Sequence, residues 1–267
     1  MHQPRAEYDR TEFTEVIRVN SIVSSFSVDS THSIQPSPSA AIVPPMYTYA
    51  FFNNPELPLS LLPGIEGEVQ IVSRAGLSAL VEPDLDLEAI QRDDNQLVQA
   101  VLTHDRMICE LFWQTTILPL RFGTFFVSLE SLLDHLESHQ KIYIEKLSQL
   151  EGKAEYRLQI TPLDLPEISL SPDLKGKHYF LAKKQQYEAQ QTAQAQQQTQ
   201  LQTVLAAIAQ AYPDRSLTEA KSGVEKLYLL VDRRQESALY EQLQVWQNQS
   251  PQWELMLGEA LPPYHFV

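Results

Sequence analysis

The order of strand-like and helix-like segments is the feature that most constrains how this chain folds. In the second half, residues 155–161 alternate polar and apolar side chains, which predicts a half-buried strand. The segments that follow are predicted to be a helix over 178–211, strands over 216–221 and 225–232, a helix over 234–248 and a strand over 253–257. This β-α-β-β-α-β order is the split βαβ arrangement of a ferredoxin-like fold.

The first half, from Met46, repeats that order with one helix missing. Its predicted elements are strands over 47–52, 68–74 and 77–82, a helix over 94–114, a strand candidate over 115–126 and a helix over 128–150. Prolines and glycines in 53–67 indicate a loop in place of the first helix. We therefore predict an α+β fold of two tandem modified ferredoxin-like domains, 46–152 and 153–267, with antiparallel sheets and helices packed on one face.

Residues 1–45 differ in composition from the rest of the chain. They contain no glycine, and the run from Ser21 to Pro45 is rich in Ser, Thr and Pro. A signal peptide would need an unbroken apolar stretch of about 7–15 residues, and five acidic residues argue against a transit peptide. We expect a mobile N-terminal extension, and we hypothesise that Met46 is the natural start.

The charge of the chain restricts its partners. Its 20 basic and 34 acidic residues give a net charge of −14, with a pI near 4.9. Such a surface repels nucleic-acid phosphates and anionic lipids, so neither nucleic acid nor a membrane is expected as a partner. No run of 18 apolar residues predicts a membrane span. The single cysteine excludes an intrachain disulfide and indicates a reducing, cytoplasmic compartment.

Motifs for enzyme or metal chemistry are weak. Gly64 and Gly67 are the only close glycine pair, and they lack the other residues of a phosphate-binding loop. Cys109 lies within a predicted helix and is interpreted as a buried structural thiol. His135 and His139 are four residues apart and could share a metal ion, but solvated positions beside the apolar stripe explain them better. We expect no catalytic residue, cofactor or metal ion.

One carboxylate lies in an unusual place. Helical spacing puts Asp105 inside the apolar stripe of the helix over 94–114, with His104 at the edge of the stripe. A carboxylate there must be hydrogen-bonded or ion-paired. We therefore predict structural polar roles for Asp105 and His104 rather than an acid–base pair.

Arg121 is a second unusual residue. Strict alternation along the strand candidate puts Leu118, Leu120 and Phe122 on one face and Arg121 on the other. Arg121 then either marks an open sheet face where a partner docks, or pairs with an acid of its own chain, Asp105 being one choice.

Two further segments could contact a partner. Ten glutamines between Gln185 and Gln202 predict a long solvated helix, with a partner-binding arm as the alternative. The proline-stiffened ending carries Tyr264 and Phe266 on an extended backbone. Such a tail suits either packing within the chain or clasping another chain.

Five segments together resemble the gas vesicle protein F/L family, in order and spacing, over about residues 46–267. They are Tyr47–Phe51, His104-Asp105, the block Ile117–Thr124 containing L-P-L-R-F-G-T, the strand at Glu155-Tyr156, and the ending Pro262–Val267. Two departures are visible: Asp105 stands where the family usually has Glu, and Gly258–Leu261 replaces a Gly-Pro-Trp-containing approach to the final prolines.

The resemblance implies a non-enzymatic accessory protein of gas vesicles that binds the small hydrophobic shell subunit (GvpA-type), and other accessory proteins, and assists assembly. It also implies association with the shell, with the gas-facing surface as the expected side. From the residues, we predict partner contacts at Leu118, Arg121, Phe122, Tyr264 and Phe266. The alternatives are a small-molecule-binding regulatory module of tandem ferredoxin-like domains, an enzyme using His104 and Asp105, and a chaperone for other oligomers.

Overall fold

A computed structural model describes residues 45–166, 175–218 and 223–267. The predicted N-terminal extension, the extended backbone around Pro172 and the end of the predicted strand over 216–221 lie outside these residues. Within them, no helix combines the length and the apolar character needed to cross a membrane.

The first sheet is antiparallel, with strand order β2-β3-β1-β4 and a short β5 that also pairs with β1. Ala75 and Gly76 form the hairpin turn between β2 and β3, and both residues have positive φ, as a type I′ turn requires. Pro119 ends an edge strand, where its missing N–H costs no ladder bond. The strands are β1 (Met46–Asn53), β2 (Gln70–Arg74), β3 (Leu77–Pro83), β4 (Ile117–Pro119) and β5 (Phe125–Phe126).

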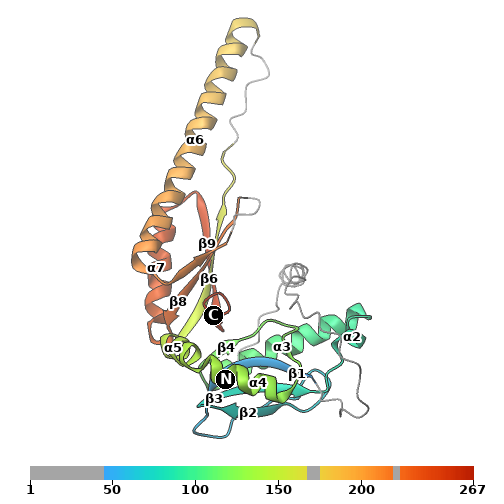
Figure 1. Cartoon of the computed structure of the whole chain (residues 1–267). Helices are drawn as coiled ribbons and strands as arrows, with labels where there is room; N and C mark the ends of the chain where they lie inside the picture. Colours follow the sequence, from blue (N-terminus) through green and yellow to red (C-terminus); the bar gives the residue numbers. More distant parts are fainter. Residues whose placement is uncertain (1–44, 167–174, 219–222) are drawn as a thin grey trace, which may run out of the picture. The chain divides into compact units, whose positions relative to one another are not determined.

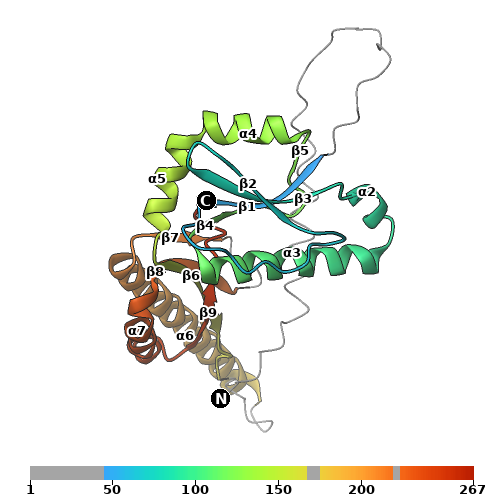
Figure 2. The same cartoon turned by 90° about the horizontal axis from the view of Figure 1, so that it is seen from below.

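Helices cover both faces of this sheet, so the prediction that they pack on one face is wrong here. Figure 2 shows α3 (Asp94–Gln114) on one side of the strands and α4 (Leu129–Ser138) with α5 (Gln140–Leu150) on the other. The cause lies in β1, where every residue from Met46 to Phe52 is buried. A strand without alternation must be buried on both faces.

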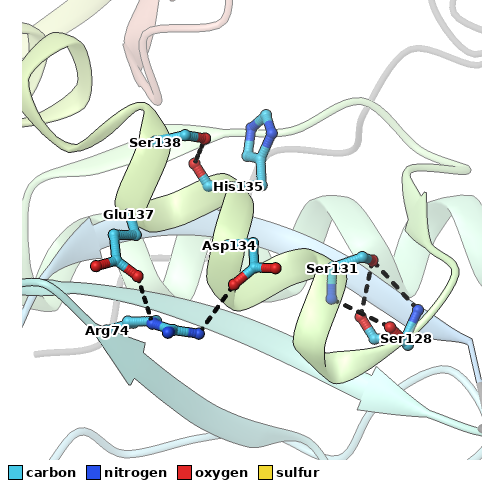
Figure 3. A network of polar contacts seen from close by, with 7 residues as sticks. All are labelled: Arg74, Ser128, Ser131, Asp134, His135, Glu137 and Ser138. Atoms are coloured by element: carbon cyan, nitrogen blue, oxygen red, sulfur yellow. Dashed lines mark hydrogen bonds and ion pairs between the residues drawn. The ribbon is translucent and has the colours of Figure 1, made fainter.

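The helix predicted over 128–150 is broken at His139, whose ψ of 7° departs from helical geometry. The imidazole Nδ1 of His139 lies 2.9 Å from the carbonyl oxygen of His135, which also accepts the His139 N–H. Figure 3 shows how α4 is fixed: Ser128 and Ser131 cap its start, and Arg74 forms ion pairs with Asp134 and Glu137. The helix over 94–114 is confirmed as α3, capped by Asp93 and preceded by a short α2 (Leu87–Ile90).

The second sheet is also antiparallel, with strand order β7-β8-β6-β9. Its helices lie against one face (Figure 1), so β6 alternates buried Tyr156, Leu158 and Ile160 with the more exposed Arg157 and Gln159. A bulge at Gly258 and Glu259, opposite Arg157 of β6, carries β9 four residues beyond its predicted end. The elements are β6 (Lys153–Pro162), α6 (Gly176–Ala211), β7 (Arg215–Leu217), β8 (Glu225–Asp232), the 3-10 turn η2 (Arg233–Gln235), α7 (Glu236–Gln249) and β9 (Trp253–Leu261).

The glutamine-rich helix is confirmed as α6, which has 36 residues and a length of about 54 Å. Only Leu201, Val204 and Ile208, near its C-terminal end, are buried. The rest of α6 extends past the sheet as a single helix (Figure 1) and is largely solvated.

Candidate functional site

Several of the motifs named in the sequence lie around the middle of α3. His104 is 5% exposed there and is the polar centre of an aromatic cluster. Its Nδ1 lies 2.6 Å from the hydroxyl of Tyr47, and its Nε2 lies 3.1 Å from the carbonyl oxygen of Leu120. Because a carbonyl can only accept, Nε2 carries the proton and Nδ1 accepts from Tyr47. Phe122 and Tyr49 pack around the ring.

The helical count assigned the two α3 residues the wrong way round. His104 is the buried one, while Asp105 is half-buried and accepts a 2.7 Å hydrogen bond from the hydroxyl of Tyr264. Burial raises the pKa of Asp105, and the bond from Tyr264 opposes that shift. The two side chains therefore hold different segments of the chain: His104 holds the end of β4, and Asp105 holds the C-terminal tail.

Burial also lowers the pKa of His104 from 6.5 to about 4, so the native ring stays neutral at pH 5 while the unfolded chain binds a proton. Stability is therefore lost as pH falls below 6.5. We expect the free energy of unfolding to fall by about 2 kcal/mol from this residue between about pH 7 and pH 5. Urea unfolding of His104→Gln should show a flatter pH dependence, whereas His178→Gln, on the exposed start of α6, should match the wild type.

The L-P-L-R-F-G-T block does not alternate as predicted, because the strand stops at Pro119. Leu118 is 3% exposed and packs in the core beneath α4 and α5, so it cannot belong to an exposed docking surface. Phe122 packs on the opposite side, against Tyr47 and His104. The chain then turns through Gly123, whose φ is +86°.

Arg121 is exposed at this turn. Its carbonyl oxygen accepts from the N–H and the hydroxyl of Thr124, which fixes the backbone. Within the described residues its guanidinium has no hydrogen-bond or ion-pair partner. Pairing with Asp105, the alternative raised by the sequence, is not found.

The C-terminal tail is folded against its own chain. Pro262 and Pro263 are buried, and Phe266 is half-buried. The N–H and Nδ1 of His265 lie 2.8 and 2.7 Å from the carboxylate oxygens of Glu155, a residue that is itself fully buried. Tyr264 is bonded to α3, in the half of the chain that forms the first sheet, and His265 is bonded to β6, in the half that forms the second. The tail therefore connects the two halves.

A second buried carboxylate, Glu82, was missed by the sequence analysis. It is 1% exposed and accepts hydrogen bonds of 2.6–2.7 Å from the backbone N–H groups of Ile65, Glu66 and Gly67. The hydroxyl of Tyr49 donates a further bond of 2.5 Å. The backbone N–H groups of residues 65–67 thus surround a carboxyl group, and that group is a side chain of the same protein.

The backbone of Gly64 lies very close to the carboxylate of Glu82. A Cβ atom at Gly64 would lie 2.3 Å from a carboxylate oxygen of Glu82, closer than such atoms approach in proteins. The Gly64-x-x-Gly67 spacing is the one feature of this loop that is visible in the sequence. Nothing in the sequence indicates that an acid at the end of β3 faces the loop.

None of these groups is arranged as a reaction centre. His104 uses both ring nitrogens in structural bonds, and the Cys109 thiol has a pKa raised to about 12, chiefly by burial. His135 and His139 stack on each other at 4.1 Å, and His135 Nε2 bonds the hydroxyl of Tyr143. Among the described residues, no three His, Cys, Asp or Glu side chains are placed to hold a metal ion.

These features define an α+β protein of two antiparallel sheets whose motif residues organise its fold, and solved gas vesicle proteins share that fold. The crystal structure of GvpF from Anabaena sp. PCC7120 matches with a TM-score of 0.61 at 16% identity, covering 84% of this chain and 95% of that one. GvpF from Microcystis aeruginosa matches with a TM-score of 0.59 at 18% identity, covering 83% and 98%.

The family assignment follows from the sequence itself. Residues 45–267 match the family described as gas vesicle synthesis protein GvpL/GvpF, and the chain belongs to that family. The comparison with curated protein sequences gives no match. The resemblance predicted from the five segments is therefore confirmed, and membership assigns the chain to gas vesicle assembly.

Proposed function

We propose that this protein binds the small hydrophobic shell subunit of gas vesicles and delivers or holds it during assembly. A subunit that will polymerise through apolar surfaces must expose them beforehand and would aggregate if unshielded. The net charge of −14 would keep a carrier with its bound subunit soluble. The gas-facing side of the shell is the side we propose it meets.

We place the contact surface near α3, because two segments of the chain are bonded to neighbouring residues of this helix. Adjacent residues His104 and Asp105 hold the Arg121 turn and the C-terminal tail, so both segments lie beside the same helix. The guanidinium of Arg121, which has no partner in the part of the chain that the structure describes, is the group most available to a subunit. Phe122, Tyr264 and Phe266 are half-buried and contribute the edges of the proposed contact.

We also infer that residues 46–152 and 153–267 are two modified ferredoxin-like domains. The support is that both sheets follow the same order, with the second strand outermost, then the third, first and fourth. The loop over 54–69 stands in the first domain where α6 stands in the second.

Arg121→Glu is expected to reduce capture of the shell subunit at least about fivefold, since it reverses the free charge at the proposed contact. The assay is a pull-down of tagged shell subunit by the purified full chain, quantified against the wild type. Arg92→Glu, an equally exposed charge reversal at the start of α3, should stay within twofold. Equal capture by both variants, with unchanged thermal melting, would remove the Arg121 turn from the interface.

A further inference from the structure

A groove of about 510 Å³ lies where α5 meets the second sheet. Its volume is in the range of ligand and peptide sites in proteins. The C-terminal end of α5 and the strands β6 to β8 form its walls, and the tail contributes one aromatic side chain. The lining residues are Lys146, Gln149, Leu150, Lys153, Pro213, Asp214, Arg215, Leu230 and Phe266.

The groove is basic, although the protein as a whole is strongly acidic. Lys146, Lys153 and Arg215 line it, against the single carboxylate of Asp214. A nearby second carboxylate, Asp232, is already held by Arg234 through three hydrogen bonds. The lining therefore keeps an excess of positive charge.

The three basic side chains differ in whether they already have hydrogen-bond or ion-pair partners. Lys153 forms a 3.3 Å ion pair with Asp214, and Arg215 Nη1 donates to the backbone carbonyls of Ala209 and Pro213. Lys146, on α5, has no hydrogen-bond or ion-pair partner within the described residues. It is thus the cation best able to meet an incoming anion.

The rest of the lining is apolar. Leu150 belongs to the core beneath α5, and the half-buried Leu230 and Phe266 pack against that core. The position of Phe266 is fixed, because its neighbour His265 is bonded to Glu155 and stacked on Tyr228 at 3.5 Å. A ligand in the groove would meet a fixed apolar surface with positive charge around it.

We propose that this groove binds an acidic peptide segment of a partner protein, one that carries an apolar or aromatic side chain among its carboxylates. Charge complementarity selects the carboxylates, and Phe266 with Leu230 receives the apolar side chain. A compact phosphate fits less well, because Lys153 and Arg215 already point at groups of their own chain and the apolar surface would stay unused. This interaction differs from the proposed capture of the shell subunit in its charged residue, which is Lys146 rather than Arg121, although Phe266 belongs to both proposed surfaces.

The test uses fluorescence anisotropy with the full chain and two fluorescein-labelled peptides. One peptide repeats Glu-Glu-Phe, and the other repeats Gln-Gln-Phe. We expect saturable binding of the acidic peptide, at least about tenfold weaker binding of its neutral counterpart, and weakening as salt rises from about 50 to 500 mM. Failure of the acidic peptide to bind, or equal binding of the neutral one, would overturn the proposal.

Two charge reversals on one helix locate the site. Lys146→Glu should weaken binding of the acidic peptide about tenfold, because it replaces an attraction by a repulsion. Lys141→Glu makes the same change at an exposed position of α5 that does not line the groove, and should alter binding less than twofold. Equal losses in both variants would mean general charge attraction, and competition by inorganic phosphate at the same concentration as peptide would identify an anion site instead. Either result would contradict the proposal.

Discussion

Glu82→Ala is expected to lower the free energy of unfolding by about 4 kcal/mol. The substitution removes the acceptor for three backbone N–H groups and for the hydroxyl of Tyr49, in a place that is 1% exposed. Each buried donor left without an acceptor costs about 1–3 kcal/mol, and four donors lose the acceptor that Glu82 supplies. Urea unfolding of the full chain, followed by circular dichroism, measures the change.

Glu66→Gln is the matched control. Its side chain is exposed and lies in the same loop, so it should change the free energy of unfolding by less than about 0.5 kcal/mol. Glu82→Gln should fall between the two, because an amide keeps one acceptor oxygen but turns an N–H₂ group toward N–H donors. If Glu82→Ala is no more destabilising than Glu66→Gln, the hydrogen bonds to Glu82 contribute nothing to the native state.

The period of the hydrophobic pattern was sufficient to predict most elements. The 21-residue helix α3 has seven buried residues, each one or three positions after the last, and Asp93 caps it. Strand β8 has the bounds that its alternation predicted, 225–232. These elements depend on local order along the chain, which the sequence contains directly.

The covering of the first sheet could have been predicted and was not. Tyr47 to Phe52 is a nearly continuous apolar run, which is typical of a strand buried on both faces. The prediction that helices cover only one face of the sheet left the other face open. Arg121 was then expected on that open face, and Leu118 was expected to be available to a partner. The covered face removes both consequences, and Arg121 is exposed because it lies on a turn after Pro119 rather than on a sheet face.

The polar contacts of the site depend on tertiary structure and could not be predicted from spacing. Tyr264 and Asp105 are 159 residues apart, and Glu82 lies 15–17 residues from the N–H groups it accepts from. Neighbouring residues on a helix point about 100° apart, so a small error in the centre of the predicted apolar stripe exchanges which of His104 and Asp105 is buried. The motif residues can be identified in the sequence, whereas their hydrogen-bond partners depend on the fold.

Deletion of the C-terminal tail tests whether its motif residues stabilise the fold of their own chain. Removal of residues 262–267 is expected to lower the free energy of unfolding by about 3 kcal/mol, because it deletes two bonds to Glu155, one to Asp105 and the packing of two buried prolines. Thermal and urea unfolding measure the loss. Val267→Ala, at the exposed chain end, should change stability by less than about 0.5 kcal/mol.

A double-mutant cycle separates the direct bond from general loss of packing. Tyr264→Phe keeps the ring and should cost about 1 kcal/mol in the wild type but clearly less in an Asp105→Ala background, since the bond between the hydroxyl and Asp105 is already absent there. Additive losses would mean that the two residues do not interact. Coupled losses, together with unchanged shell-subunit capture by Tyr264→Phe, would assign the family's aromatic ending to holding the two halves of the chain together and leave the Arg121 turn as the contact with the partner.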